Sequence, residues 1–122
     1  MAQRQLIAFV DDDQAVCETM MGLLRAFDFD AEAFSSAEEF LDSGRLDETS
    51  CLITDVQLGG MSGLQLQRHL ADRGYRFRVI FITAFPDDRV STQAMNAGAI
   101  DVLSKPVTKD ALLGAIHSAL DR

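Results

Sequence analysis

The sequence contains few cysteines and no long apolar run. Cys17 and Cys51 are its only two cysteines, and they show neither a CxxC motif nor another spacing typical of metal ligands. A zinc site is therefore not expected, whereas reduced thiols in the core of a cytoplasmic protein are. No segment approaches the roughly 18 apolar residues of a transmembrane helix. Because the first apolar run is also too short for a signal peptide, we expect a cytoplasmic chain without a membrane segment.

Basic residues are scarce beside acidic ones. The 11 Lys and Arg residues face 19 Asp and Glu residues, which gives a formal net charge of −8. Nonspecific nucleic-acid binding needs a basic surface that displaces counterions, so we do not expect direct nucleic-acid binding by this chain. We also expect no pair of DNA-recognition helices in the sequence up to Arg122. An acidic surface instead suits a basic protein partner.

Five short apolar runs alternate with amphipathic segments, and neither a repeat nor a linker interrupts them. The runs are Leu6–Val10, Ala31–Phe34, Cys51–Thr54, Arg78–Thr83 and Ile100–Ser104. Near-continuous apolar strands that alternate with helices are typical of a parallel sheet covered on both faces. The length suits one domain. The pattern therefore predicts a single α/β domain over residues 1–122, with a (βα)5 order and a doubly wound five-stranded parallel sheet.

Local signals mark the helices between these strands. The first helix is predicted to pack through one face, which carries Val16, Met20, Leu23, Leu24 and Phe27. Met21 and Met95 are also expected at packed positions. Helix-capping residues occur at five places, namely Asp13, Ser36 with Glu39, Ser62 with Gln65, Asp87 or Asp88, and Thr108. In the first of the two capping boxes, Glu39 is predicted to accept a hydrogen bond from the Ser36 N–H.

Polar residues stand at the ends of four apolar runs. Asp11-Asp12-Asp13 follows the first run, Asp55 follows the third, Thr83 ends the fourth, and Lys105 follows the fifth. In an open parallel sheet the ligand site lies beyond the carboxyl ends of the strands. We therefore expect carboxylates, a hydroxyl and an ammonium to meet at one edge of the sheet.

The residue types at this edge suit a hard cation and a phosphoryl group. Asp11, Asp12 and Asp55 supply only oxygen ligands, which Mg²⁺ prefers, and no histidine or cysteine lies in these loops. Lys105 can pair with a carboxylate and later with a phosphoryl oxygen. Thr83 can donate a hydrogen bond to the same oxygen.

Five short motifs in the expected order carry a resemblance to a known family. They are Val10-Asp11-Asp12-Asp13, Thr54-Asp55-Val56 followed by Met61-Ser62-Gly63, Thr83-Ala84, Ala97-Gly98-Ala99, and Lys105-Pro106. Each motif is weak alone, but together they are highly specific. Over essentially its whole length the chain resembles the receiver domain of bacterial two-component response regulators. The resemblance implies a flavodoxin-like sheet with the strand order 2-1-3-4-5.

The resemblance also implies roles for individual residues. Asp55 would be the phosphoacceptor, and Thr83 would be the switch hydroxyl. Lys105 would bind the phosphoryl group and precede a cis peptide bond. Asp11, Asp12 and Asp55 would hold Mg²⁺ together with the backbone carbonyl of Gln57. Such a protein is not an enzyme in the usual sense, because it assists its own phosphorylation and dephosphorylation.

The resemblance further implies partners. A sensor histidine kinase or a phosphotransfer protein would supply the phosphoryl group, and a downstream output protein or domain would receive the signal. The face formed by the fourth helix, fifth strand and fifth helix would change on phosphorylation and could form a homodimer. Residues 82–87 and 37–40 are similar to receivers that precede helix-turn-helix output domains.

Two positions depart from the usual receiver pattern, and Phe85 lies at a third position, where receivers vary. Val102 stands where an aromatic residue usually relays the movement of the threonine, so we expect switching through loop and helix movement. Gly59-Gly60 replaces a common Pro-Gly pair, which should loosen the loop after Asp55. Phe85 is expected to shield the acyl phosphate from water, so Phe85→Ala should shorten its lifetime.

Three other functions remain as alternatives. A degenerate receiver could act as a phosphorylation-independent protein-binding module, although all the acceptor and metal residues are present. An aspartyl-phosphate hydrolase needs a second carboxylate shortly after the nucleophile, where this chain has Val56 and Gln57. A dinucleotide-binding protein would need a glycine-rich first loop in place of Asp11-Asp12-Asp13.

Overall fold

The computed structural model describes residues 5–75, 77–84 and 87–120. Five parallel strands form one sheet in the order β2-β1-β3-β4-β5, which confirms the predicted topology. The strands are β1 (Leu6–Val10), β2 (Asp30–Phe34), β3 (Thr49–Asp55), β4 (Arg78–Thr83) and β5 (Asp101–Ser104). The helices are α1 (Gln14–Ala26), α2 (Ala37–Leu41), α3 (Gly63–Asp72), α4 (Asp88–Asn96) and α5 (Lys109–Leu120), with a short 3-10 helix η1 (Leu46–Glu48).

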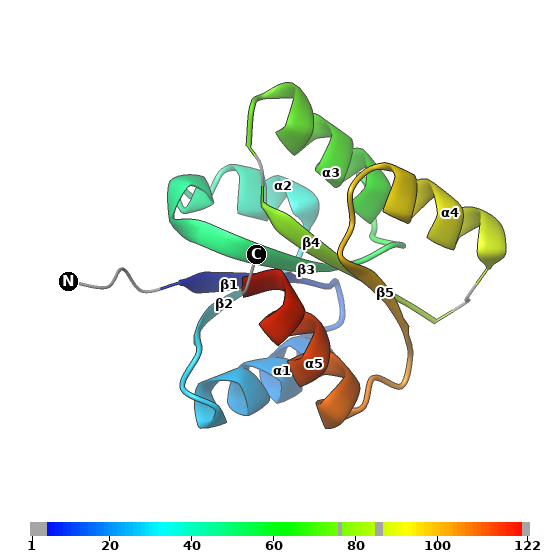
Figure 1. Ribbon diagram of the computed structural model, residues 1–122. Coiled ribbons are helices and arrows are strands. Elements are labelled where there is room, and N and C mark those ends of the chain that lie inside the picture. Colours follow the sequence, from blue (N-terminus) through cyan, green and yellow to red (C-terminus); the bar gives the residue numbers. More distant parts are fainter. Residues whose placement is uncertain (1–4, 76, 85–86, 121–122) are drawn as a thin grey trace.

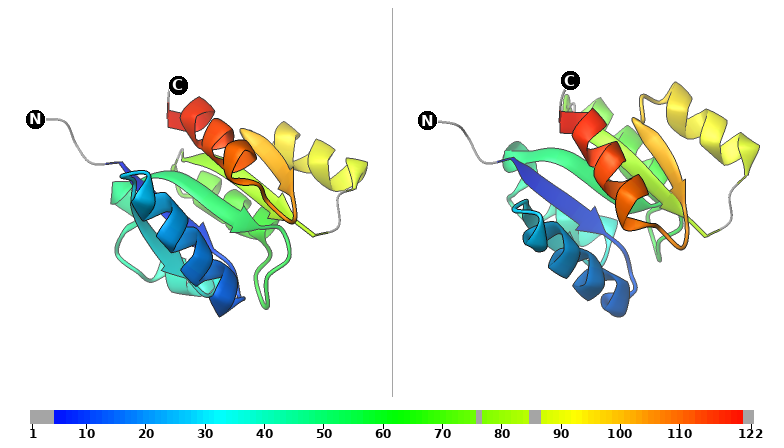
Figure 2. Two further views of the ribbon diagram at one scale, coloured as in Figure 1. Left: turned by 90° about the horizontal axis from the view of Figure 1, so that it is seen from below. Right: turned by 60° about the horizontal axis from the view of Figure 1, so that its bottom comes forward.

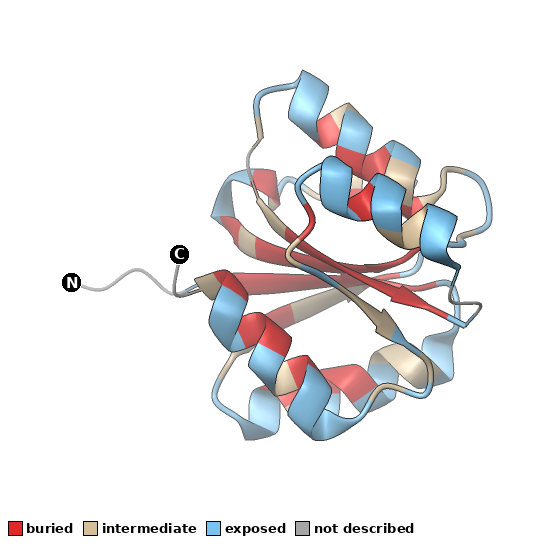
Figure 3. Ribbon diagram, turned by 45° about the vertical axis from the view of Figure 1, so that its right-hand side comes forward, coloured by how far each residue is buried: buried red, intermediate tan, exposed pale blue. Residues whose placement is uncertain are grey.

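Helices cover both faces of the sheet. Figures 1 and 2 show α1 and α5 on one face and α2, α3 and α4 on the other. β1 is apolar throughout, and β3 and β4 are apolar in their middle parts, because both faces of these central strands are buried. Figure 3 shows these buried strands between helices that are buried only on their inner sides. Two core clusters result, one on each face of the sheet.

The helix ends follow local chemistry that could be recognised in the sequence. Asp13, Ser36, Ser62 and Asp87 each accept a hydrogen bond from a backbone N–H in the first turn of their helix. Thr108 likewise accepts one from the Ala111 N–H at 3.1 Å. These contacts satisfy N–H groups that have no partner inside the helix. They fix where each helix begins, and therefore where each loop after a strand must turn.

The first capping box differs from its prediction. The Glu39 carboxylate accepts hydrogen bonds from the Ser35 N–H and hydroxyl, at 3.3 and 2.8 Å, and not from the Ser36 N–H. The second box is complete, since Ser62 and Gln65 each accept a hydrogen bond from the other's N–H. The Ser35 hydroxyl offers Glu39 a second donor, and both Ser35 donors can bind the carboxylate at once.

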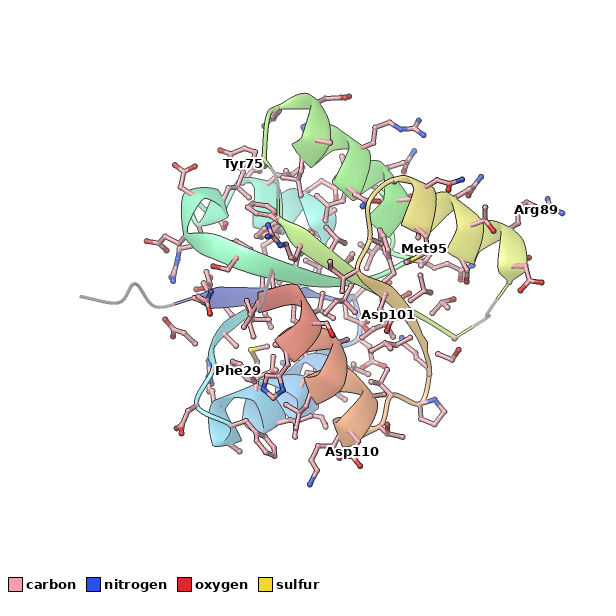
Figure 4. All side chains as sticks on the ribbon, viewed as in Figure 1. Phe29, Tyr75, Arg89, Met95, Asp101 and Asp110 are labelled. Carbon is pink, nitrogen blue, oxygen red and sulfur yellow. The ribbon has the colours of Figure 1, made fainter. Side chains whose placement is uncertain are left out.

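Two hydrophobic residues lie outside the core, contrary to expectation. Phe27 is 43% exposed because α1 ends at Ala26, and the Phe27 ring lies 5.7 Å from the Lys109 ammonium. Met95 is 49% exposed on α4 (Figure 4). Cys17 and Cys51 are both free thiols, as expected, and form no disulfide. Cys51 is buried and Cys17 is half-buried. No helix in the described part of the chain is long and apolar enough to cross a membrane.

Candidate functional site

The loops that follow β1, β3, β4 and β5 leave the sheet at one edge (Figures 1 and 2). The register explains why, since Val10 pairs with Thr54, Asp55 pairs with Ile82, and Thr83 pairs with Ser104. Four strand ends therefore lie level with one another. The polar residues at these strand ends, or directly after them, therefore occupy one region, as the sequence predicts.

Lys105 joins two buried carboxylates at this edge. Its Nζ lies 2.6 Å from Asp55 Oδ2 and 3.4 Å from Asp11 Oδ2. Asp11 is 1% exposed and Asp55 is 6% exposed, whereas Lys105 is half-buried. Ion pairs that are withdrawn from water are screened less than those on the surface. The three side chains, from the carboxyl ends of three separate strands, thus form one electrostatic unit.

Backbone groups orient both carboxylates. Asp11 Oδ1 accepts a hydrogen bond from the Asp13 N–H at 2.9 Å, and Asp55 Oδ1 accepts one from the Gln57 N–H at 2.9 Å. In each carboxylate one oxygen is held by its own loop, and the other oxygen faces the Lys105 ammonium. This arrangement leaves the Oδ2 atoms directed toward a common point.

The electrostatic environment shifts the pKa values of two of these groups. Burial raises the pKa of Asp11 above its ordinary value of 3.8, although the Asp13 N–H and the charge of Lys105 act in the opposite direction. Burial alone would lower the pKa of Lys105, but the hydrogen bond to Asp55 and the charges of both carboxylates outweigh it. The pKa of Lys105 is therefore raised above 10.5. One ammonium serves two carboxylates, which leaves excess negative charge in the site.

Asp12 occupies a different position from the other two aspartates. It is exposed, and its Oδ2 accepts a hydrogen bond from the Gly59 N–H at 3.3 Å. Among the described residues, the Lys105 ammonium forms its ion pairs with Asp11 and Asp55. Across the described ranges, no three His, Cys, Asp or Glu side chains are grouped closely enough to hold a metal ion as they stand.

Thr83 is the last residue of β4 and is 3% exposed. Its carbonyl accepts a hydrogen bond from the Lys105 N–H at 2.8 Å, so the two strand ends are linked through the backbone. Val102, two residues before the end of β5, is half-buried and packs against the core cluster on the α3 and α4 side. The Lys105–Pro106 peptide bond is cis, as expected. Phe85 lies outside the described residues.

Two features of the loop between β3 and α3 were not predicted. A Cβ at Gly63 would lie 2.3 Å from the Asp55 carbonyl oxygen, so this position requires glycine. The Glu38 carboxylate on α2 accepts a hydrogen bond from the Met61 N–H at 3.2 Å. Gly63 could have been singled out from its place in the Met61-Ser62-Gly63 motif. The contact of Glu38 spans 23 residues, and no local pattern signals it.

An apolar cavity of about 550 Å³ opens beside the site, between α1 and the loop after β5. Asp11 and Lys105 line it together with Val16, Met20 and Pro106. The charged groups of the site thus have water-accessible space on one side and the closely packed sheet on the other.

Comparison with known proteins agrees with this geometry. Residues 7–117 match the family model for the response regulator receiver domain. The response regulator protein TmoT of Ectopseudomonas mendocina is 44% identical over 119 residues, which cover 97% of this chain and 54% of that protein. The transcriptional regulatory protein TdiR of Thauera aromatica is 38% identical over 111 residues, covering 91% of this chain and 49% of that protein. The chain therefore spans about half the length of these relatives.

A solved structure extends the comparison to three dimensions. The crystal structure of FixJ-N matches with a TM-score of 0.87 at 30% sequence identity, covering 99% of this chain and 97% of that chain. The similarity thus extends over essentially the whole fold.

Proposed function

The chain belongs to the response regulator receiver domain family, which signals by phosphorylation in two-component systems, and we propose that Asp55 is its phosphoacceptor. The observation that carries this proposal is the contact between Asp55 and Lys105. Asp55 stands at the end of β3 with Oδ1 bound to its own loop and Oδ2 2.6 Å from the Lys105 ammonium. Oδ1 is therefore held in place by the backbone. Oδ2 is paired with the Lys105 ammonium, which can also pair with an oxygen of a phosphoryl group bound to Asp55.

Phosphorylation would proceed by nucleophilic attack of the Asp55 carboxylate. One of its oxygens attacks phosphorus of a phosphohistidine or of a small phosphodonor. The new oxygen–phosphorus bond forms as the bond from phosphorus to the donor breaks, and the donor atom keeps the electron pair. The Lys105 ammonium neutralises charge on the phosphoryl oxygens. Water later cleaves the acyl phosphate and restores the carboxylate.

The donor set fits a magnesium ion. Asp11, Asp12, Asp55 and the backbone carbonyl of Gln57 are proposed to hold Mg²⁺, which would supply positive charge to the transferring group. Two observations support this fit. The candidate ligands are all oxygen atoms, and the two buried carboxylates share only one ammonium, with the pKa of Asp11 raised by burial. Mg²⁺ keeps several water ligands, so it does not need three carboxylates already gathered around it.

Thr83 and Val102 are proposed to take part in the response. The added phosphoryl group carries a charge of about −1.5 to −2. The Thr83 hydroxyl would move toward its oxygens and bias the position of the loop after β4. Because Val102 is too small to swing as an aromatic ring does, the change would pass through movement of this loop and α4.

The protein is proposed to act as a switch and not as an enzyme with a separate substrate. A degenerate receiver that binds partners without phosphorylation is the alternative. In a receiver that is never phosphorylated, no function requires a lysine paired with a buried acceptor carboxylate. The contacts of Lys105 with Asp55 and Asp11 therefore favour the phosphorylated switch.

We propose a sensor histidine kinase or phosphotransfer protein as donor and an output protein or domain as receiver of the signal. TdiR is described as a transcriptional regulatory protein, which suggests that the output here is transcription. A cytoplasmic location agrees with such partners. The face of α4, β5 and α5 is proposed to form a homodimer after phosphorylation, and the exposed Met95 on α4 supports a contact there. Gel filtration with and without phosphorylation tests this dimer.

Incubation with acetyl phosphate and Mg²⁺, followed by intact mass measurement, tests the proposal. We expect the wild-type chain to gain one phosphoryl group and the Asp55→Asn variant to gain none. Uptake without Mg²⁺ at the same rate would contradict the role of the metal. If the wild-type chain gains no phosphoryl group from acetyl phosphate, and none when a kinase extract is added, the degenerate receiver is favoured.

A further inference from the structure

Two acidic side chains from different elements hold the loop at residues 56–62, which begins directly after β3. Asp12, after β1, accepts a hydrogen bond from the Gly59 N–H at 3.3 Å. Glu38, on α2, accepts one from the Met61 N–H at 3.2 Å. We propose that Glu38 is a positioning residue for phosphorylation, which holds this loop so that its backbone can complete the magnesium site.

The glycine pair of this loop makes the arrangement feasible. Proline, common at the first of these positions in receivers, has no N–H and could not donate a hydrogen bond to Asp12 as Gly59 does. Gly60 has a φ of +83°, and a Cβ there would lie 3.1 Å from Glu38 Oε2. Backbone and carboxylate therefore approach closely at this point. Compared with a Pro-Gly pair, the loop lacks the stiffness of a proline but has one more N–H, which donates a hydrogen bond to Asp12.

The two contacts have different consequences for metal binding. Asp12 is itself a proposed ligand of Mg²⁺, so its bond to Gly59 competes with the metal for the same carboxylate. Glu38 is not a proposed ligand, and its bond to Met61 can persist while metal is bound. The hydrogen bond between Glu38 and Met61 holds the loop at a point after Gln57. The carbonyl of Gln57 is a proposed ligand, and its N–H donates a hydrogen bond to Asp55. Because the loop is held at Gln57 and again at Met61, the Gln57 carbonyl can adopt fewer orientations.

The adjacent residue provides a matched control. Glu39 carries the same charge on the same short helix, but its carboxylate binds the N–H and hydroxyl of Ser35 and not the loop. Replacing Glu39 therefore removes one negative charge near the site and disturbs the start of α2. It leaves the contact between Glu38 and Met61 in place.

The inference rests on the proposed roles of Asp55 and Mg²⁺, and metal affinity tests it without any phosphorylation. Backbone amide shifts of the unphosphorylated protein are titrated with Mg²⁺ in the wild type and in Glu38→Ala, Glu38→Gln and Glu39→Ala. We expect Glu38→Ala to raise the dissociation constant about three- to tenfold, as for loss of one charge-assisted hydrogen bond. Glu38→Gln should stay within about twofold of the wild type, because its amide oxygen can accept from the same N–H. Glu39→Ala should behave like Glu38→Gln.

Phosphate uptake from acetyl phosphate separates positioning from general damage to the fold. Glu38→Ala should need more Mg²⁺ for half-maximal rate and should approach the wild-type rate at saturating Mg²⁺. Unchanged affinity in Glu38→Ala would overturn the proposal. Equal weakening in Glu38→Gln or Glu39→Ala would also overturn it, because charge and not the hydrogen bond would then be the cause. If Asp55 is not the acceptor, phosphate uptake will persist in Asp55→Asn. That outcome is separate, because the Mg²⁺ affinities of the wild type and the Glu38 and Glu39 variants can still follow the expected order.

Discussion

At the scale of residues, the main feature of the site is the Lys105 ammonium, which lies between the buried carboxylates of Asp11 and Asp55. Lys105 compensates Asp55 closely and Asp11 less closely, at 2.6 and 3.4 Å. Burial therefore leaves the ionised form of Asp11 less stable in the folded protein than in water, which is why its pKa is raised. In the absence of metal, Asp11 is expected to cost stability in exchange for its role in binding a cation.

Replacing Asp11 by asparagine should stabilise the protein in the absence of Mg²⁺. At pH 7 we expect the free energy of unfolding to rise, because asparagine removes the charge whose burial raises the pKa of Asp11. A carboxyl group whose pKa is raised on folding binds its proton more tightly in the folded state, so its contribution becomes less unfavourable as the pH falls. The gain should therefore shrink through the raised pKa and vanish below the ordinary value of 3.8. Urea unfolding at several pH values measures this.

Asp13→Asn is the control for this effect. Asp13 is exposed and caps α1, and asparagine caps a helix about as well as aspartate. Its unfolding free energy should change by less than about 0.5 kcal/mol. A loss of stability in Asp11→Asn at pH 7 would mean that the ion pair with Lys105 outweighs the cost of burial.

At the scale of elements, the close packing of α3 against the end of β3 determines the shape of the acceptor loop. Gly63 begins α3 and donates its N–H to the Val56 carbonyl at 2.9 Å. The backbone of α3 thus comes close enough to Asp55 that there is no space for a side chain. The start of the helix and the acceptor residue are fixed relative to each other by this contact.

Gly63→Ala should therefore disturb both stability and phosphorylation. Its Cβ would lie 2.3 Å from the Asp55 carbonyl oxygen and 3.3 Å from the Phe81 ring, so the backbone must shift. We expect a loss of about 2–3 kcal/mol in the free energy of unfolding, typical of forced overpacking, and slower phosphate uptake. Gly22→Ala is the matched control, because its Cβ would meet nothing within 4 Å in the interior of α1. That change should stabilise the protein by up to about 1 kcal/mol.

The contact between α3 and the end of α4 leaves one buried polar atom without a partner. Gln67 is 7% exposed, and its Nε2 donates a hydrogen bond to the Ala97 carbonyl at 3.2 Å. Its Oε1 has no hydrogen-bond partner within the described structure. An unpaired buried acceptor costs about 1–3 kcal/mol, whereas one hydrogen bond contributes about 1 kcal/mol.

Gln67→Met should consequently leave stability unchanged or raise it by up to about 1 kcal/mol. Methionine has a similar length and flexibility and removes the unpaired oxygen. Urea unfolding of this variant is compared with Gln93→Met, at an exposed position on α4 that should change little. A loss of more than about 1 kcal/mol in Gln67→Met alone would contradict this, because the hydrogen bond to the Ala97 carbonyl would then outweigh the cost of the unpaired oxygen.

At the scale of the whole molecule, the sequence was sufficient for features that depend on local chemistry. The alternation of apolar runs predicted the five strands, and β4 has the predicted bounds Arg78–Thr83. Capping residues predicted where helices begin. The four polar positions at strand ends were predicted to meet because parallel strands end at the same edge. The strand order came only from the resemblance, since no local pattern contains it.

Features without a clear local signal, and features that depend on distant contacts, were not predictable. The 3-10 helix at Leu46–Glu48 is too short to show a hydrophobic period. Phe27 continued the apolar period of α1 but lies just beyond the helix end, next to Asp28 with a φ of +66°. The contact of Glu38 with Met61 joins two elements whose relative position follows only from the packed fold. In the same way, the sequence could not show that Asp12 faces the loop while Asp11 and Asp55 share Lys105.

Chemical mapping of the acceptor tests the central claim most directly. The wild-type protein is phosphorylated with acetyl phosphate and Mg²⁺ and then treated with sodium borohydride, which reduces an aspartyl phosphate to homoserine. Peptide mass spectrometry locates the change. We predict homoserine at position 55 and at no other aspartate, with none formed in Lys105→Met under brief exposure, since the ammonium is then missing. Homoserine at Asp11 or Asp12, or a phosphoryl group on a residue other than aspartate, would contradict the account.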